Sequence, residues 1–335
     1  MKRTLFIGML GLSALMSGYA QQGEGVRKGR IVREPLVHDP VMAKEGDTYY
    51  LYSTGHNVSS FSSKDLSEWT IRHGVFPAPP QWAMDSIPEY KGHTWAPDII
   101  YYKGNYHLFY SCSAFGKNTS AIGHAYRKTL NPDSDEPWTD TGAVIVSHSH
   151  DNFNAIDPNI VIDEEGNPWM TFGSFWGGIQ LVRLTEDLTS TLKPEKLYTI
   201  CTRQFEGASD VPSRSVNSVE APFIFKHGGY YYLFVSYDFC CRGLKSDYKV
   251  VVGRSTRVTG PYVDKDGREL TRGGGSLVVD SNDEFVAIGH SAAYHFDGKD
   301  YFMAHGYSRS EDGASKLFFR EMTWDEEGWP FVSAE

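Results

Sequence analysis

Acidic residues recur at the starts of short apolar segments along this chain, mostly beside a proline. They are Asp39, Asp98, Asp157 and Glu220, and His290 takes the matching place in a fifth segment. Carboxylates that gather in one place repel one another and lose hydration, which raises the pKa of some of them. One group can then keep its proton while another stays ionised, as acid–base hydrolysis of a glycosidic bond requires. The residue types therefore suggest a hydrolytic site, provided that the fold brings them together.

The acidic positions could also have a structural or a metal-binding role. Asp-Pro and Glu-Ala-Pro can simply begin strands, with the acidic side chain acting as a turn cap. Carboxylates also suit calcium, but the acidic turns at 46–48 and 163–167 lack the dense alternation of a calcium loop.

The segments that carry these residues are copies of one unit, in which a short apolar strand, a glycine-containing turn and an aromatic-rich strand follow one another. The five copies are HDPVMAKEGDTYYLYSTG (38–55), APDIIYYKGNYHLFYSCS (96–113), IDPNIVIDEEGNPWMTFGS (156–174), EAPFIFKHGGYYYLFVS (220–236) and GHSAAYHFDGKDYFMAHGYS (289–308).

The spacing of the copies predicts the fold. They recur about every 60 residues, which leaves room for two further strands in each unit. Five units of four strands indicate an all-β, five-bladed β-propeller that forms a single domain over residues 30–335. A sandwich or a β-helix is the alternative. In a propeller the inner strands line one axis, so the acidic residues would meet at one end of it.

The first 20 residues read as a secretory signal peptide. Lys2 and Arg3 precede the apolar run LFIGMLGLSALM, and small residues end at Ala20. The apolar run is short for a membrane span, and no later stretch is long enough for one. We expect a secreted or periplasmic protein.

Charge and composition limit the class of partner. The formal net charge is −10, and removal of Lys2 and Arg3 with the signal peptide takes it to −12. An acidic protein without a basic run is a poor ligand for nucleic acid. Aromatic residues make up 14% of the chain, and their flat faces suit stacking on sugar rings.

Four cysteines are too few for a disulfide scaffold in a chain of 335 residues. Cys240 and Cys241 are adjacent, and a bridge between neighbours is geometrically unfavourable. We expect free or structural thiols.

The ordered set of motifs VHDP, WAPD, NAIDP, FGSFWGGI, VEAPFIF, DFCCRG, VVVGRS and GHSAAYHFDGKDY resembles glycoside hydrolase family 43 over residues 30–330. The segments FGSFWGGI and DFCCRG resemble its endo-1,5-α-L-arabinanase branch. The resemblance implies that Asp39 is the general base, Glu220 the general acid, and Asp157 the carboxylate that orients the acid and raises its pKa. Asp98 is expected to be structural.

The resemblance also implies residues around the reacting centre. His290 would contact a metal ion, expected to be Ca²⁺, which would be structural or tune the carboxylates; no organic cofactor is expected. Candidate substrate-binding residues are Trp95, Phe115, Gly116, Asn154, Ile156, Asn159, Ser174 and Phe175.

The expected activity is inverting cleavage of internal α-1,5 bonds of arabinan by a secreted monomer that binds arabinan and arabino-oligosaccharides. The alternatives are an exo-acting α-L-arabinofuranosidase or β-xylosidase, and a sugar-binding propeller without activity. Because one fold hosts many functions, the choice among them depends on the resemblance.

Overall fold

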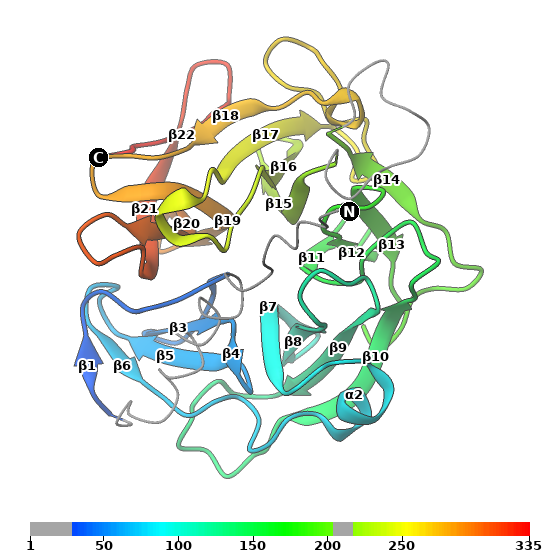
Figure 1. Cartoon of the computed structure of the whole chain (residues 1–335), viewed down its shortest axis with the longest axis vertical. Coiled ribbons are helices and arrows are strands. Elements are labelled where there is room, and N and C mark those ends of the chain that lie inside the picture. The colour runs from blue at the N-terminus through cyan, green and yellow to red at the C-terminus, as the bar shows by residue number, and fades with distance from the viewer. Residues whose placement is uncertain (1–28, 204–216) are drawn as a thin grey trace, which may run out of the picture.

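The computed structural model describes residues 29–203 and 217–335. The expected signal peptide at residues 1–20 lies outside them. Five antiparallel sheets surround a central axis (Figure 1), which confirms the predicted five-bladed propeller. None of the helices among the described residues is long and apolar enough to cross a membrane.

Blades I and II each contain one short strand more than the four expected. Blade I runs β1-β6-β5-β3-β2 from its outer edge to the axis, and blade II runs β10-β9-β8-β7-β4. Their strands are β1 (Ile31–Val32), β2 (Val41–Glu45), β3 (Thr48–Ser53), β4 (Gly55–His56), β5 (Ser59–Ser63), β6 (Trp69–Ile71), β7 (His93–Tyr102), β8 (Asn105–Cys112), β9 (Ser120–Arg127) and β10 (Thr139–Ser147).

The other three blades have four strands in simple sequential order. Blade III holds β11 (Asn159–Ile162), β12 (Pro168–Phe172), β13 (Ile179–Arg183) and β14 (Tyr198–Cys201); blade IV holds β15 (Val219–His227), β16 (Tyr230–Tyr237), β17 (Lys249–Ser255) and β18 (Ser276–Val279); blade V holds β19 (Phe285–Phe296), β20 (Lys299–Ser308), β21 (Ser315–Trp324) and β22 (Pro330–Val332).

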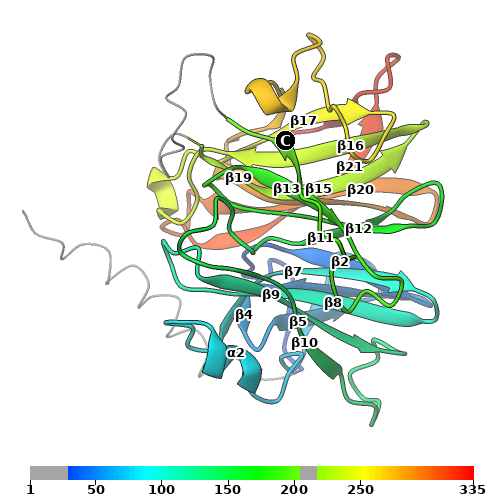
Figure 2. The same cartoon turned by 90° about the vertical axis from the view of Figure 1, so that its right-hand side faces the viewer.

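The few helical segments lie outside the sheets. They are α2 (Gln81–Ser86), η2 (Gly243–Lys245) and η3 (Leu270–Arg272). Helix α2 follows blade I and lies beside β10 at the rim of the molecule (Figure 2).

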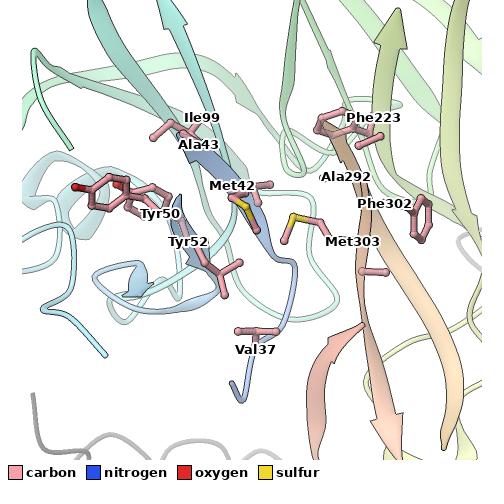
Figure 3. Close-up of a cluster of buried hydrophobic side chains, with 14 of the residues drawn as sticks. Val37, Met42, Ala43, Tyr50, Tyr52, Ile99, Phe223, Ala292, Phe302 and Met303 are labelled. Atoms are coloured by element: carbon pink, nitrogen blue, oxygen red, sulfur yellow. The ribbon is translucent and has the colours of Figure 1, made fainter. Parts of the chain in front are cut away.

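The hydrophobic core fills the spaces between neighbouring blades. One large cluster joins blades I, II, IV and V, and two smaller ones join blade III to blades II and IV. At the contact between the first and last blades, Met42 of β2 and Met303 of β20 lie beside one another (Figure 3). Burial of this apolar surface is what holds the separate sheets in one ring.

The ring closes through the segment before β2. Val37 donates its N–H to the Ser315 carbonyl at 3.1 Å, and Leu317 donates to the Pro35 carbonyl at 3.2 Å. The Ser315 hydroxyl also donates to the Val37 carbonyl at 2.6 Å. These bonds fix the entry to β2 against blade V, and Asp39 follows directly.

Candidate active site

Each blade has a non-glycine residue in the left-handed region within its inner strand or two residues before it, where the strand approaches the axis. These residues are Asp39 (φ 56°), Ala96 (φ 38°), Asp157 (φ 58°), Ala221 (φ 55°) and His290 (φ 51°). Side chains rarely adopt such φ values, which cost free energy unless neighbours hold them in place. The repetition identifies five equivalent positions around the axis.

These positions correct the alignment expected from the sequence. Asp39, Asp157 and His290 are equivalent, but Glu220 lies one residue before the equivalent position and Asp98 two residues after it. A break in register spans these positions, between Trp95 and Asp98 in blade II and between Glu220 and Phe223 in blade IV, and blade V has the same break between Gly289 and Ala292. A bulge of this kind re-aims side chains, so counting from the proline does not align them.

The left-handed residues are tied to the preceding blade by a closed ring of hydrogen bonds, in which each backbone N–H donates to a side chain. The five links, 2.8–3.2 Å long, are Asp39 to His305 Nδ1, Ala96 to Thr54 Oγ1, Asp157 to Ser111 Oγ, Ala221 to Asp157 Oδ2 and His290 to Ser236 Oγ. One link crosses each of the five blade interfaces, so the ring stabilises the strained backbone at the axis.

The acceptors share one place on the second strand. Ser111 pairs with Trp95, Ser236 with Glu220, and His305 with Gly289. Thr54 and Gly173 stand opposite the corresponding residues of blades I and III. Gly173 has no side chain to offer, and the carboxylate of Asp157 makes that link instead. The sequence analysis did not identify these acceptors. A hydroxyl or imidazole recurs near the end of four aromatic-rich strands, and this recurrence could have indicated them.

Asp39 receives more hydrogen bonds than any other acid at this end of the axis. Its Oδ1 accepts from His38 Nδ1 at 2.8 Å and from His290 Nδ1 at 2.9 Å, and its Oδ2 accepts from the Thr54 hydroxyl at 2.5 Å. Burial alone would raise the pKa of Asp39, but His290 and His38 hold it well below its usual value. Asp39 is therefore ionised at neutral pH.

His38 donates a hydrogen bond to the Asp39 carboxylate, whereas His305 accepts one from the Asp39 backbone. His38 is itself held in place through its other ring nitrogen. The Cys241 N–H donates to the Tyr307 hydroxyl at 2.7 Å, and that hydroxyl is 3.0 Å from His38 Nε2. His305 Nδ1 lies 3.6 Å from Asp39 Oδ1, but it accepts the Asp39 N–H and burial keeps the pKa of His305 well below its usual value. His305 is thus a neutral acceptor and does not form an ion pair with Asp39.

Glu220 and Asp157 show the opposite behaviour. Burial raises the pKa of Glu220, with a further contribution from the negative charge of Asp39, and this outweighs the hydrogen bond that the Ser174 hydroxyl donates at 2.7 Å. Burial also raises the pKa of Asp157 well above its usual value, and the charges of Glu220 and Asp39 add to that. The site thus combines an ionised carboxylate with carboxyl groups that retain protons more readily.

His290 contacts this group from blade V. Burial would lower the pKa of His290, but the charge of Asp39 and its hydrogen bond, followed by the charges of Asp157 and Glu220, raise it to about 9. We find no partner for His290 Nε2 among the described residues. A histidine that donates one N–H to a carboxylate and leaves its other nitrogen free has the usual arrangement of a metal ligand, so His290 fits the expected metal.

Asp98 does not join the acidic group. Its carboxylate accepts from the Ile160 N–H at 2.7 Å and from Asn159 Nδ2 at 3.3 Å, and burial raises its pKa to about 7. Asn159 in turn accepts the Ile224 N–H at 2.8 Å. Both side chains connect neighbouring blades, and Asn159, which is expected to bind substrate, is buried between them.

The remaining expected substrate-binding residues fall into two groups. Phe115 is exposed, and Trp95, Gly116 and Phe175 are half-buried, so these four can be reached from solvent. Asn154, Ile156 and Ser174 are buried. Asn154 accepts the Ser120 hydroxyl at 2.7 Å, and Ser174 donates to Glu220. The side chains of Asn154 and Ser174 therefore make hydrogen bonds inside the protein.

The loop that follows β16 forms part of the same rim. Phe239 lies 5.6 Å from Phe175 between ring centroids, and Cys241 Sγ is 3.8 Å from His38 Nε2. Cys240 and Cys241 form a disulfide, so the expectation of free thiols was wrong for this pair. Cys241 is left-handed (φ 67°), a conformation that the sequence did not indicate. Cys112 and Cys201 are free and buried.

This chain is similar in sequence and structure to several known proteins. An extracellular exo-α-(1→5)-L-arabinofuranosidase of Cellvibrio japonicus is 49% identical over 298 residues, covering 88% of this chain and 86% of that protein. An extracellular endo-α-(1→5)-L-arabinanase of Bacillus subtilis is 40% identical, covering 88% and 87%. The crystal structure of an exo-1,5-α-L-arabinanase from a bovine ruminal metagenomic library is 51% identical, covers 90% of this chain and 98% of that one, and superposes with a TM-score of 0.84.

The family model for glycosyl hydrolases family 43 matches residues 30–330, which include every residue of the acidic group and all strands of the five blades except the last two residues of β22. The protein is therefore a glycoside hydrolase and belongs to glycosyl hydrolases family 43.

Proposed function

We propose that this enzyme hydrolyses α-1,5-linked arabinan with inversion at the anomeric carbon. The observation that carries the proposal is the opposite tuning of two carboxyl groups at one end of the axis. The pKa of Asp39 is held low by two imidazoles, and that of Glu220 is raised by burial. Such pairs divide the roles of base and acid. The substrate class is taken from the three relatives described above, each of which is named for α-1,5-linked arabinose.

In this mechanism Glu220 donates its proton to the glycosidic oxygen as the bond to the anomeric carbon breaks. Asp39 takes a proton from a water molecule that attacks that carbon from the opposite face. The product is a free sugar end of inverted configuration, with Asp39 protonated and Glu220 ionised. Proton exchange with solvent then restores both groups. Inversion requires a separation of roughly 6.5–9.5 Å between the two carboxyl groups.

Asp157 has an orienting role in this proposal. Its carboxylate accepts the N–H of Ala221, the residue next to Glu220, at 3.2 Å. It therefore holds the backbone that carries the acid. The increase in the pKa of Glu220 itself comes from burial and from Asp39.

The half-buried and exposed aromatic residues at the rim are the proposed contacts for arabinose rings. Trp95 lies one residue before Ala96, at the entrance to the axis, and Phe115 follows β8 on the same side of blade II. Phe175 is supported by Phe239 across the blade III–blade IV boundary. Flat aromatic faces stack on the apolar faces of sugar rings.

His290 would hold a bound Ca²⁺ through Nε2, with water completing the coordination, because an oxygen-seeking ion takes few nitrogen ligands. The ion would supply fixed positive charge beside the carboxylates. Since the pKa of His290 is raised to about 9, ion binding must displace a proton from Nε2 and should strengthen as pH rises.

The mode of attack has two candidates. Internal cleavage is the expectation from the sequence motifs, and the Bacillus subtilis relative is named an endo-enzyme. Two relatives that are 49% and 51% identical to this chain are named exo-enzymes, which favours cleavage from chain ends. Secretion is proposed from the leading apolar segment and from the names of two extracellular relatives.

Product analysis on debranched arabinan tests both parts of the proposal. A ladder of oligosaccharides at early times indicates internal attack, and one short product from the first minutes indicates chain-end attack. We expect Asp39→Ala and Glu220→Ala each to reduce turnover by about 10²–10⁴-fold. Wild-type rates in either variant, or binding of arabinan without release of reducing ends, would overturn the proposed function.

A further inference from the structure

Thr54 makes two hydrogen bonds that fix the direction of its single hydroxyl proton. The Ala96 N–H donates to Thr54 Oγ1 at 2.8 Å, so the oxygen acts as an acceptor toward blade II. Thr54 Oγ1 donates to Asp39 Oδ2 at 2.5 Å, so the hydroxyl proton points to that oxygen. The side chain is also branched at Cβ, which restricts its rotation.

This contact leaves Asp39 with one open position. Each carboxylate oxygen can accept about two hydrogen bonds. Oδ1 already accepts from His38 and His290, whereas Oδ2 accepts from Thr54 alone. Among the described residues we find no second donor to Oδ2. A water molecule that gives its proton to Asp39 therefore meets Oδ2, the oxygen that Thr54 holds.

The remaining hydroxyl acceptors of the axial ring do not share this arrangement. Ser111 and Ser236 accept the N–H groups of Asp157 and His290, and their own protons are not donated to Asp39. Ser174 donates to Glu220 but stands one residue past the ring position. Thr54 thus combines a link between two blades with direct contact to the proposed base.

We propose that Thr54 is a positioning residue that selects Oδ2 of Asp39 as the proton acceptor for the attacking water. The assignment rests on the proposed role of Asp39 as general base. By holding the carboxylate plane through Oδ2, Thr54 aims the free lone pair of that oxygen toward the water. The same hydroxyl also accepts the Ala96 N–H of blade II, so the orientation of the Asp39 carboxylate depends on the contact between blades I and II.

Steady-state kinetics on debranched arabinan tests the inference. Thr54→Val keeps the shape of the side chain but removes the hydroxyl. We expect kcat to fall about 10- to 100-fold, the range for loss of one hydrogen bond to a charged group, with KM within about twofold of wild type. Thr54→Ser restores the hydroxyl on a less restricted side chain, and we expect it to recover kcat to within about threefold of wild type.

Tyr294→Phe is the matched control. The Tyr294 hydroxyl accepts the Met42 N–H at 3.0 Å across the blade V–blade I boundary, so its loss also leaves a backbone N–H between blades unpaired. Tyr294 is not among the groups that contact Asp39. We expect its kcat to equal that of wild type while its unfolding midpoint falls as that of Thr54→Val does. An equal loss of kcat in Tyr294→Phe would overturn the inference.

A double-mutant cycle with Asp39→Asn separates positioning from a general structural defect. If Thr54 acts through Asp39, adding Thr54→Val to Asp39→Asn causes no further loss of residual kcat. A full additional loss, or a single Thr54→Val variant with normal kcat, removes the positioning role and leaves the proposed function intact. Wild-type activity in Asp39→Asn would instead overturn the proposed function, and the inference with it.

Discussion

At the scale of single residues, the site uses imidazoles to set the charge of its base. His38 and His290 both donate to one oxygen of Asp39, although they come from opposite ends of the propeller sequence. The sequence motifs identified His290 as a candidate but not His38, since a histidine next to Asp39 would ordinarily point away from it along a strand. The left-handed backbone at Asp39 removes that alternation.

The two tuned carboxyl groups predict the shape of the pH profile. The base must be ionised, so activity falls as pH drops through the pKa of Asp39, which lies well below its usual value. The acid must be protonated, so activity falls as pH rises through the pKa of Glu220, which is raised. We expect kcat/KM to show an acid limb below the usual aspartate range and an alkaline limb above the usual glutamate range.

Glu220→Gln is the control for this profile. It should lower kcat/KM by about 10²–10⁴-fold and abolish the alkaline limb of the remaining activity, because no proton is left to lose. An alkaline limb that persists unchanged in this variant would assign the acid to another residue.

His290 predicts a pH dependence of stability. Its pKa is raised to about 9 in the folded protein, against about 6.5 in an unfolded chain. The folded state therefore holds the proton more tightly. The resulting stabilisation, up to about 3 kcal/mol, is complete below about pH 6.5 and is lost as pH rises through about 9.

Urea denaturation in the presence of a chelator, at pH 6.5 and pH 9.5, measures this contribution. We expect the free energy of unfolding to fall between these two conditions by more in the wild type than in His290→Gln. Equal falls in the two proteins would show that other groups cause the dependence.

At the scale of elements, the important feature is the register between the first two strands of each blade. Because the pairing just before the bulge is the same in these blades, side chains from four second strands reach the backbone of the next blade at the same level along the axis. Blade III differs, since Gly173 (φ +129°) occupies this place and a Cβ there would lie 2.8 Å from the Gly178 carbonyl oxygen. The absence of a side chain leaves the Ala221 N–H for Asp157.

Gly173→Ala should therefore destabilise the protein. Its φ is unfavourable for alanine and the new Cβ meets backbone that cannot move easily, so we expect a loss of about 2–4 kcal/mol in the free energy of unfolding. Gly166→Ala is the matched control. Its φ is +83° but nothing lies within 4 Å of the added Cβ, and a loss of about 1–2 kcal/mol is expected. Similar losses in the two variants would refute the steric argument.

The repeated hairpins could be predicted from the sequence because their signals are local. Alternating aromatic and β-branched residues and glycine turns depend on neighbours in the chain. The relation of Glu220 and Asp98 to the axis could not be predicted, because a bulge re-aims the side chains around it and leaves no mark in composition. The disulfide of Cys240 and Cys241 was missed for a similar reason, since it depends on a left-handed residue within a loop.

At the scale of the whole molecule, the propeller must join its last blade to its first. The sequence predicted five units around an axis but not how the ring closes. β1 joins the outer edge of blade I, and residues 35–37 pair with blade V instead. Closure therefore depends on a few backbone bonds and on apolar packing between Met42 and Met303, both of them fully buried.

Met303→Ala tests how much that packing contributes to the free energy of unfolding. It removes a buried side chain at the closing interface and leaves a cavity, so we expect a loss of about 2–5 kcal/mol. Met84→Ala is the control, because Met84 on α2 is 43% exposed and its truncation should change stability by no more than about 0.5 kcal/mol.

Urea denaturation followed by fluorescence and by circular dichroism measures both variants. Because one apolar cluster joins blade V to blades I, II and IV, the two probes should report a single transition in Met303→Ala, shifted to lower urea with an unchanged slope. Separate transitions would mean that blade V detaches before the rest, and the closing interface would then not be part of the common core.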